Sequence, residues 1–483
     1  MSRLVGSSVI AWVVLCSPVP VWADKAEDQV VAFVEKRGGR VIRDEQAPGK
    51  PVLKVFLDNV VLKDEELKEL TPLTNLTELN LAVSDVTDAG LKDLVGMKYL
   101  THLDLNGATK VTDAGLKELA KLTNLTSLTL NQTQVTDAGM KELAKLKNLT
   151  RLNLLWTHVS DSGLEELAPL TKLAALSLPT SNNPQFSGRV TNTGLRKLAG
   201  LKSLTTLHLN GNSITDEGLK ELAKLKNLTR LTFYHTGVTA TGLKELTQLP
   251  NLTGLGLSYS KVTNAGLKEI GKLRGLIELS IDNDAMSWMT DAGLKELAPL
   301  NHLTSLRLAD KGVTNAGLKE LSGLTKLTSL DLSYTRVTDA GLKELTKLKH
   351  LTKLSLLGCQ VNGSGLGQLT ELKELDLRYT SITAAGVKEL AKLKQLTRLY
   401  VSGWMNDAGL RELSGLKHLT ILSLLGSEVT DAGMTELTKL KNLTILNLAG
   451  TKVTPEGISK LRQVWPKCFI HANSYYSLPD EIR

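Results

Sequence analysis

The feature that most constrains the fold is a leucine pattern, L-x-x-L-x-L, that returns along most of the 483 residues, usually after 24 residues. A single hydrophobic core stops growing at roughly 250–300 residues, but a repeat array escapes this limit because each unit packs only against its neighbours. Degenerate units at Val52 and near Ile470 extend the array to roughly eighteen strands. The first leucines of the pattern are Leu76, Leu100, Leu125, Leu149, Leu173, Leu204, Leu228, Leu252, Leu276, Leu303, Leu327, Leu351, Leu372, Leu396, Leu419 and Leu443.

Each unit has two halves with different hydrophobic periods. In the unit that begins at Leu125, Leu128 and Leu130 alternate with Thr129, which predicts a short strand with one buried face. The other half, VTDAGMKELAKL, predicts a short helix of about ten residues, which would be marginal without its neighbours. We therefore expect an α/β solenoid, with parallel strands on a concave face and short helices on a convex face.

The recurring VTDAG segment predicts the start of each helix. Thr136 is suited to the N-cap, and Asp137 then meets the positive end of the helix dipole. Val135 and Met140 have the spacing of a hydrophobic staple. Glycine inside a helix costs roughly 1 kcal/mol relative to alanine. The return of Gly139 in nearly every unit therefore indicates close approach to the neighbouring repeat.

The pattern L-x-x-L-x-L-x-x-T-x-[VI]-T-D-x-G-L resembles the leucine-rich repeats of the ribonuclease-inhibitor-like and cysteine-containing subfamilies. The run of VTDAGLKEL units also resembles exported repeat proteins of planctomycete bacteria. This resemblance covers about residues 52–470 and implies a horseshoe fold and a protein-binding scaffold. The chain departs from the cysteine-containing type, because Thr, Ser or Asn usually follows the strand and cysteine does so only at Cys359. No F-box precedes the repeats, so the resemblance does not imply a ubiquitin-ligase receptor.

The N-terminus, MSRLVGSSVIAWVVLCSPVPVWA, predicts a secretory signal peptide in residues 1–23, cleaved after Ala23. A membrane anchor is the alternative, but the apolar core is shorter than the roughly 17–25 residues that span a bilayer. We expect an N-terminal cap, helix plus hairpin or loop, in residues 24–51. About 17 repeats of about 24 residues follow in 52–457, with a C-terminal cap and tail in 458–483. We expect an exported bacterial protein, periplasmic, at the cell surface or secreted, that is monomeric and has no membrane span.

Candidate metal and catalytic groups have simpler explanations. The repeated aspartates could form a calcium ladder, but calcium-binding repeats are much shorter, and Ala240 interrupts the series. His102 with Asp104, and His208 with Asn210, show no third ligand. No G-x-S-x-G, H-E-x-x-H, C-x-x-C or phosphate loop is present, so we predict neither an enzyme nor a bound cofactor or metal. The aspartates in question are Asp88, Asp113, Asp137, Asp161, Asp216, Asp291, Asp339 and Asp431.

Two cysteines remain after cleavage at Ala23. Cys359 and Cys468 lie four to five repeats apart, more than about 15 Å at the usual strand spacing, so we predict two free, buried thiols. Lysines such as Lys141 and Lys145 are interleaved with glutamates on the helical half of each unit. This distribution favours a solvated exterior over a nucleic-acid-binding surface.

Aromatic residues make up only 4% of the chain but recur at one place in the repeat. Several lie two residues after the last apolar residue of the strand, and others lie nearby or in two long loops. We predict that they form a rim that grips a protein or peptide partner, because aromatic residues are enriched at interfaces. Chance exposure, packing between repeats and drift in the loops remain alternatives, as do carbohydrate or cell-envelope binding and an enzyme-accessory or inhibitor role. The predicted rim residues are Trp156, Tyr234, His235, Tyr259, Tyr334, Tyr379 and Tyr400, with Phe186 and Trp288 in the loops.

Overall fold

The computed structural model describes residues 25–472, apart from 59, 180–189, 212 and 284–286. The chain divides into two compact units, Met1–Thr133 and Gln134–Arg483. The predicted signal peptide and Phe186 lie outside the described residues. Among the helices of the described part, none is long and apolar enough to cross a membrane.

The first unit begins with a helix and a small antiparallel sheet. Helix α1 (Lys25–Lys36) buries Val30 and Val34, and β1 (Arg40–Arg43) pairs antiparallel with β2 (Val52–Phe56). From β2 onward the strands of this unit are parallel. Its remaining elements are α2 (Asp64–Leu67), η1 (Lys68–Leu70), β3 (Glu78–Asn80), η2 (Gly90–Gly96), β4 (His102–Asp104), α3 (Asp113–Leu119) and β5 (Ser127–Thr129).

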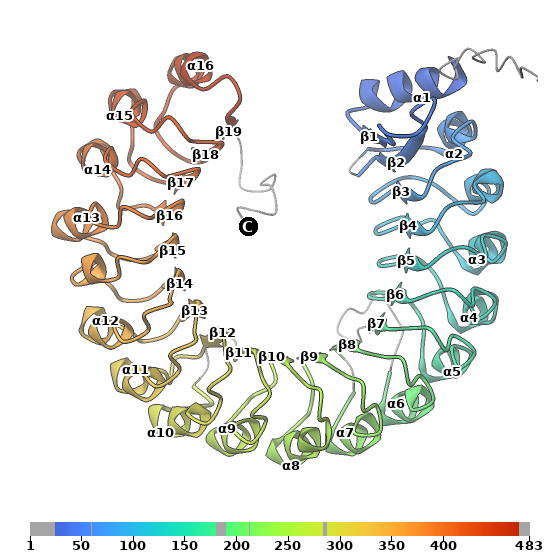
Figure 1. The fold of residues 1–483 in the computed structure, drawn as a ribbon, viewed down its shortest axis with the longest axis horizontal. Coiled ribbons are helices and arrows are strands. Elements are labelled where there is room, and N and C mark those ends of the chain that lie inside the picture. Colours follow the sequence, from blue (N-terminus) through green and yellow to red (C-terminus); the bar gives the residue numbers. More distant parts are fainter. Residues whose placement is uncertain (1–24, 59, 180–189, 212, 284–286, 473–483) are drawn as a thin grey trace, which may run out of the picture. The chain divides into compact units, whose positions relative to one another are not determined.

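The strands of the second unit form one parallel sheet in which each strand pairs with the next along the chain. Equivalent residues face one another, as Leu279 does Leu306. Within this unit the strands line the inner side of the curve and the helices the outer side (Figure 1). The strands are β6 (Arg151–Asn153), β7 (Ala175–Ser177), β8 (Thr206–Asn210), β9 (Arg230–Tyr234), β10 (Gly254–Ser258), β11 (Glu278–Asp282), β12 (Ser305–Ala309), β13 (Ser329–Asp331), β14 (Lys353–Ser355), β15 (Glu374–Asp376), β16 (Arg398–Ser402), β17 (Ile421–Leu425), β18 (Ile445–Asn447) and β19 (Phe469–His471).

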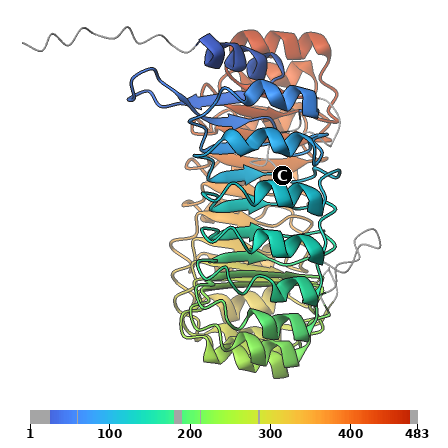
Figure 2. The same cartoon turned by 90° about the vertical axis from the view of Figure 1, so that its right-hand side faces the viewer.

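The helices of the second unit follow one another in chain order along the outer side of the curve, and α4 to α6 lie one above another (Figure 2). Most span seven residues, shorter than predicted, because the chain turns back toward the next strand after the second helical turn. They are α4 (Asp137–Leu143), α5 (Asp161–Glu165), α6 (Asn192–Leu198), α7 (Asp216–Leu222), α8 (Ala240–Glu245), η3 (Leu246–Gln248), α9 (Asn264–Ile270), α10 (Asp291–Leu294), η4 (Lys295–Leu297), α11 (Asn315–Leu321), α12 (Asp339–Leu345), η5 (Leu366–Gln368), α13 (Ala384–Leu390), α14 (Asp407–Leu413), α15 (Asp431–Leu437) and α16 (Pro455–Val464).

The core of each unit lies between its sheet and its helices and consists mainly of the consensus leucines. In one repeat, Leu327 and Leu332 from the strand half and Leu342 from the helix are fully buried. Burying a leucine side chain contributes roughly 1.5–3 kcal/mol, so this periodic burial outweighs the weak propensity of a seven-residue helix. The predicted α/β solenoid is confirmed.

The predicted cap at Thr136 is confirmed, because its side chain accepts from the Ala138 N–H, but the side chains at four equivalent positions make no cap hydrogen bond; these are Thr215, Thr263, Thr290 and Thr338. The aspartate has a second role that the sequence did not reveal. The Thr430 hydroxyl accepts a hydrogen bond from the Ala432 N–H. Thr430 also donates two bonds to Asp407 of the preceding repeat, from its N–H (2.8 Å) and from its hydroxyl (2.7 Å). The same pair of bonds joins Asp64 to Thr87, Asp88 to Thr112, Asp137 to Ser160, Asp161 to Thr191, Asp216 to Thr239, Asp291 to Thr314 and Asp431 to Thr454. We call this series the aspartate–threonine ladder.

The recurrence of glycine at one position of the repeat follows from this ladder. A Cβ atom on Gly433 would lie 2.3 Å from Oδ1 of Asp407, and one on Gly242 would lie 2.3 Å from Oδ1 of Asp216. No side chain fits there while the carboxylate keeps its two hydrogen bonds. The predicted close approach to the neighbouring repeat is therefore confirmed.

Both cysteines in the described residues are free, as predicted, but only one is buried. Cys359 lies in the core, with its sulfur 3.0 Å from the Leu332 carbonyl oxygen, and burial raises the pKa of its thiol. The prediction that Cys468 is buried is wrong. This residue lies in the turn before β19, the last described strand, and it is partly exposed.

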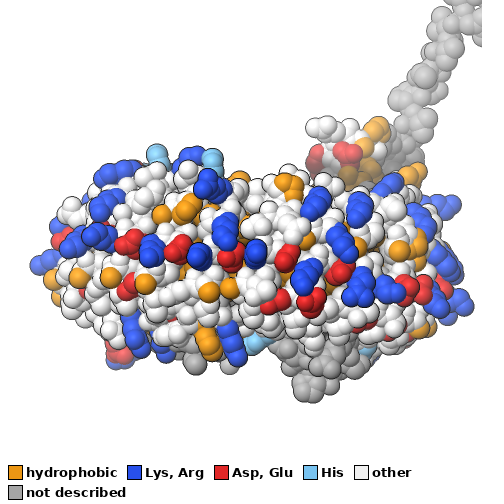
Figure 3. Space-filling model, turned by 90° about the horizontal axis from the view of Figure 1, so that it is seen from below, with side chains coloured by type: hydrophobic (Ala, Val, Ile, Leu, Met, Phe, Trp, Pro, Cys, Tyr) orange, Lys and Arg blue, Asp and Glu red, His pale blue; other side chains and the backbone are white. Residues whose placement is uncertain are grey.

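The outer face carries interleaved charges, as the lysine pattern predicted. Figure 3 shows blue and red side chains alternating over the helical side of the second unit. Many pair within one repeat, as Lys224 Nζ does with Glu221 at 2.6 Å. Such exposed pairs contribute at most about 1 kcal/mol each.

Candidate functional site

Five of the nine predicted rim residues share an unusual backbone conformation. Trp156 (φ +56°), His235 (+52°), Tyr259 (+53°), Tyr334 (+59°) and Tyr379 (+56°) all lie in the left-handed region, directly after their strands. Glycine occupies the same position, also with positive φ, in five other repeats of the second unit. These are Gly211, Gly358, Gly403, Gly426 and Gly450.

The sheet itself imposes this conformation. The N–H of Tyr334 donates to the Leu357 carbonyl oxygen of the next repeat at 2.7 Å, which extends the ladder of strand hydrogen bonds. The chain must then turn toward the helix, and the hydroxyl of buried Thr335 donates to the Leu332 carbonyl oxygen at 2.7 Å. A left-handed residue between the two bonds allows this turn, which is why glycine suits the position.

Large rings at this position cost stability that their burial does not return. A non-glycine residue in the left-handed region costs about 1 kcal/mol or more. Tyr379 nevertheless stays 62% exposed, Tyr334 44% and Trp156 39%. Burial therefore does not account for the Trp156, Tyr334 and Tyr379 rings. We take the left-handed row, defined as Trp156, His235, Tyr259, Tyr334 and Tyr379, as the candidate binding surface.

Three rings of this region contact one another across two repeats. The rings of His235 and Tyr259 stack, with centroids 4.6 Å apart and planes at 17°. Tyr234 packs edge-on against both, at 4.7 Å and 4.9 Å. Aromatic pairs of this geometry contribute about 0.5–1.5 kcal/mol beyond their buried area, so the three rings form a preorganised cluster.

Trp288 adds a further ring to the surface, and Tyr334 of the left-handed row reaches into the next repeat. Trp288 is 38% exposed, and Nζ of Lys261 lies 5.4 Å from its ring centroid. The ring of Tyr334 leans over the next repeat, where a Cβ on Gly358 would lie 2.6 Å from Cδ1 of the tyrosine. Because Gly358 has no side chain, it leaves room for the Tyr334 ring.

Tyr400 does not belong to the exposed surface, and its inclusion among the rim residues is corrected. The strand register places it between Asp376 of β15 and Ser423 of β17. It is only 5% exposed, with the Arg378 guanidinium 5.5 Å from its ring centroid, and burial raises the pKa of its hydroxyl.

Charges on the inner face pair with one another. Arg307 of β12 bonds Asp282 at 2.9 Å and also Asp331, and thus joins β11, β12 and β13. Arg230 reaches across Gly254 to Glu278 at 2.6 Å. This bond raises the pKa of the arginine and lowers that of the glutamate. The remaining inner-face pairs include Arg378–Asp376 and Lys353–Glu374.

The predicted histidine pairs show no metal geometry. His102 is exposed, and His208 Nδ1 lies 2.6 Å from the Thr232 hydroxyl while burial lowers the pKa of its imidazole. Within the described ranges, no three His, Cys, Asp or Glu side chains are grouped as metal ligands.

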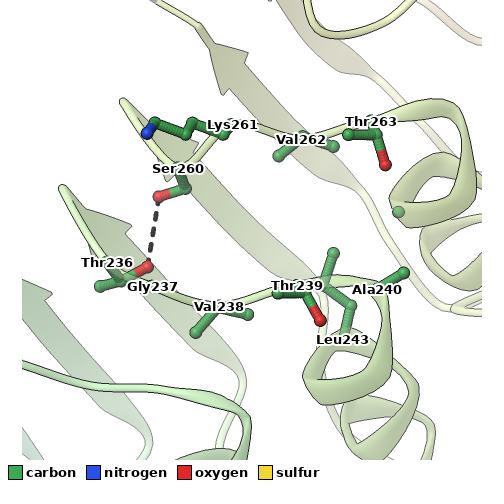
Figure 4. A pocket seen from close by; sticks show the side chains of 11 residues that line it. Thr236, Gly237, Val238, Thr239, Ala240, Leu243, Ser260, Lys261, Val262 and Thr263 are labelled. Carbon is green, nitrogen blue, oxygen red and sulfur yellow. Dashed lines mark hydrogen bonds between the residues drawn. The ribbon is translucent and has the colours of Figure 1, made fainter.

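A cavity lies next to the stacked rings, where the aspartate–threonine ladder is interrupted. Ala240 replaces the aspartate here, and a cavity of about 180 Å³ opens between two repeats (Figure 4). A cavity of about 160 Å³ lies beside Ala384, another alanine at the same repeat position. Where asparagine replaces aspartate the ladder continues, because Asn192 accepts from the Thr215 N–H and donates to its hydroxyl.

Sequence reasoning found the rings of the left-handed row by their spacing but missed their backbone conformation. The indication was present, because Gly358, Gly426 and Gly450 occupy the aligned position in other repeats. It also missed the two cavities, although alanine at 240 stood out in the aspartate series.

Comparisons with known proteins agree with this architecture. A family model described as Leucine Rich repeat matches residues 73–95, 96–120, 121–144, 145–168, 200–223, 323–345, 368–391 and 439–461. A leucine-rich-repeat protein of Leptospira interrogans is 25% identical, covers 85% of this chain and 99% of its own, and has a TM-score of 0.48. The internalin inlF of Listeria monocytogenes is 21% identical over 88% of this chain and 94% of its own, with a TM-score of 0.35.

TLR13, in its complex with ssRNA13, shares the solenoid fold. It is 19% identical over 86% of this chain and 71% of its own, with a TM-score of 0.53. No curated protein sequence matches the chain.

Proposed function

We propose that the chain is an exported, non-catalytic leucine-rich-repeat scaffold that binds a protein or peptide partner through the left-handed row, a proposal supported by the eight segments that match the repeat family. The observation that carries this proposal is the conformational free energy that the left-handed row costs the folded protein. Five repeats keep a large ring at a position where five others have glycine. A costly, exposed feature of this kind is what a binding surface requires and a stable core does not.

The inner-face charges indicate what kind of partner suits this surface. Arg230, Arg307 and Arg378 are each paired with a carboxylate of the same face. At these three positions a partner would therefore meet neutralised ion pairs, whereas Lys261, which is exposed beside Trp288, remains a cation without a carboxylate partner in an ion pair among the described residues. We expect the partner's affinity to depend only weakly on salt, because screening acts mainly on unpaired exposed charges.

A carbohydrate or cell-envelope polymer is the second candidate ligand. The observation that favours it is the ring of Tyr334, which leans over Gly358 of the next repeat and remains 44% exposed. Such a supported ring offers a flat apolar surface on which a sugar ring can stack.

A capture experiment tests both candidates. The mature chain and a Tyr334→Ala/Tyr379→Ala variant are immobilised, and proteins captured from an envelope extract are compared by quantitative mass spectrometry. A glycan array with the same two proteins is the second arm. The proposal predicts a protein captured by the wild type and lost from the variant. A glycan bound by the wild type alone, with no protein captured, would show that the ligand is a carbohydrate rather than a protein.

A further inference from the structure

We propose that the cavity beside Ala240 is the anchor pocket of this surface and takes an aliphatic side chain of the partner. This inference rests on the proposed binding function and names the chemistry that the partner must carry. Figure 4 shows the cavity between two successive repeat loops, with Val238 and Leu243 on one side and Val262 on the other.

The cavity leaves small parts of the core valines that line it accessible to solvent. Val238 is 6% exposed and Val262 is 4% exposed. The valines at the same repeat position in ladder-joined repeats, such as Val159, Val190 and Val313, are all 0% exposed. An apolar guest would remove the uncovered surface from water, at roughly 25 cal/mol per Å².

The size of the cavity fits one side chain. Its volume is about 180 Å³, and an apolar cavity of about 150 Å³ is large enough to hold benzene. A valine, leucine or isoleucine side chain therefore fits. The Thr236 and Ser260 hydroxyls are 3.3 Å apart and bond each other, so they do not require a polar guest (Figure 4).

The cavity adjoins the left-handed row. Thr236 and Ser260, which line it, directly follow the stacked residues His235 and Tyr259 in the chain. A partner residue inserted here would hold its own backbone beside the stacked rings. Energetically dominant contacts of interfaces have this form, an anchor side chain in a well-packed pocket surrounded by contacts that exclude water.

The charge beside the cavity indicates which charged group the partner should carry. Lys261 is the charged residue among those that line the cavity, and its side chain is exposed. A carboxylate next to the aliphatic anchor would therefore be favoured over an amine. The expected recognition element is an aliphatic residue adjacent to an acidic group.

Isovalerate, a branched aliphatic carboxylate, is a probe of this chemistry. It is titrated into the mature chain with ¹³C-labelled Val and Leu methyl groups, and the methyl shifts of Val238, Leu243 and Val262 are followed by NMR. Saturable shifts confined to this region support the proposal. Isobutanol, which lacks the charge, should shift the same methyl groups at higher concentration. The absence of shifts at these methyl groups with isovalerate overturns the inference.

Two matched variants separate pocket filling from unfolding. Ala240→Asp should restore the ladder bonds to Thr263, raise Tm, and abolish the isovalerate shifts. Ala384→Asp makes the same change at the other cavity and should leave these shifts intact. Shifts that persist in Ala240→Asp contradict the proposal.

A partner identified by capture gives a readout that distinguishes the two proposals. Ala240→Asp should weaken the affinity for this partner by about tenfold or more, as loss of an anchor residue does. Unchanged affinity in Ala240→Asp, together with loss of capture by the Tyr334→Ala/Tyr379→Ala variant, would overturn the pocket and keep the binding function. Capture that survives loss of the rings would overturn the function itself, whatever isovalerate does.

Discussion

Asp216 accepts two hydrogen bonds from Thr239 of the next repeat, one from its N–H at 2.8 Å and one from its hydroxyl at 2.7 Å. Hydrogen bonds to a carboxylate are about twice as strong as those between neutral groups. The VTDAG segment thus acts across repeats as well as within its own helix. The threonine caps its own helix and bonds the preceding aspartate, and the glycine leaves room for that aspartate.

Asp216→Ala should lower the free energy of unfolding by about 2 kcal/mol, because the Thr239 N–H and hydroxyl lose their acceptor. Asp216→Asn is the matched control and should retain most of the stability, since Asn192 makes equivalent bonds to Thr215. Urea denaturation of the whole chain checks both variants. Equal losses in the two variants would show that the negative charge, rather than the hydrogen bonds, is what matters.

Gly433→Ala should destabilise the protein by about 1–3 kcal/mol, the usual cost of forcing a methyl group into a filled space. The added Cβ would lie 2.3 Å from Asp407 Oδ1. Gly323→Ala is the control, since its Cβ meets no atom within 4 Å and its φ is not positive. Thermal unfolding should show a lower Tm for the first variant only.

The ladder should make stability depend on pH on the acid side. The hydroxyl and N–H of Thr454 lower the pKa of Asp431 from 3.8. A carboxyl with a depressed pKa in the folded state stabilises above its unfolded pKa, and this contribution is lost as pH falls through the folded pKa. Asp431→Asn should therefore flatten part of the fall in Tm below about pH 4. An unchanged pH profile in this variant would contradict the assignment.

The two thiols should react slowly and at different rates. Burial raises the pKa of both, that of Cys468 to about 11, so little thiolate exists at neutral pH. Cys468 is partly exposed and Cys359 is buried, so iodoacetamide should label Cys468 first. Peptide mass spectrometry of the native protein gives the order. Earlier labelling of Cys359 would indicate that its repeat opens locally.

Much of the fold could be predicted from the sequence because the same residue pattern recurs in many repeats. Leucine spacing located strand and helix, and Thr136 and its equivalents marked the helix starts. The bonds between Asp407 and Thr430 were missed, because they connect residues 23 positions apart and depend on how repeats stack. A cavity is likewise a property of two neighbouring repeats, so alanine at 240 alone did not reveal it.

The candidate site was predictable in part. Tyr334 and Tyr379 were located by register alone, because position in the repeat fixes position on the sheet edge. Tyr400 was misjudged because strand alternation tells which face a side chain lies on, but not how much of that face its neighbours cover. The left-handed backbone went unnoticed because rings occupy the position in five repeats, although glycine, the usual residue there, occupies it in five others.

The most direct test of the central claim is the Kd of the captured partner for a Trp156→Gly/Tyr334→Gly/Tyr379→Gly variant, measured beside its Tm. Glycine suits the left-handed backbone at these positions, so the variant should fold with an unchanged or higher Tm. Loss of three interface rings should raise Kd by about a hundredfold or more. An unchanged Kd in a stably folded variant would contradict the claim that this row is the binding surface.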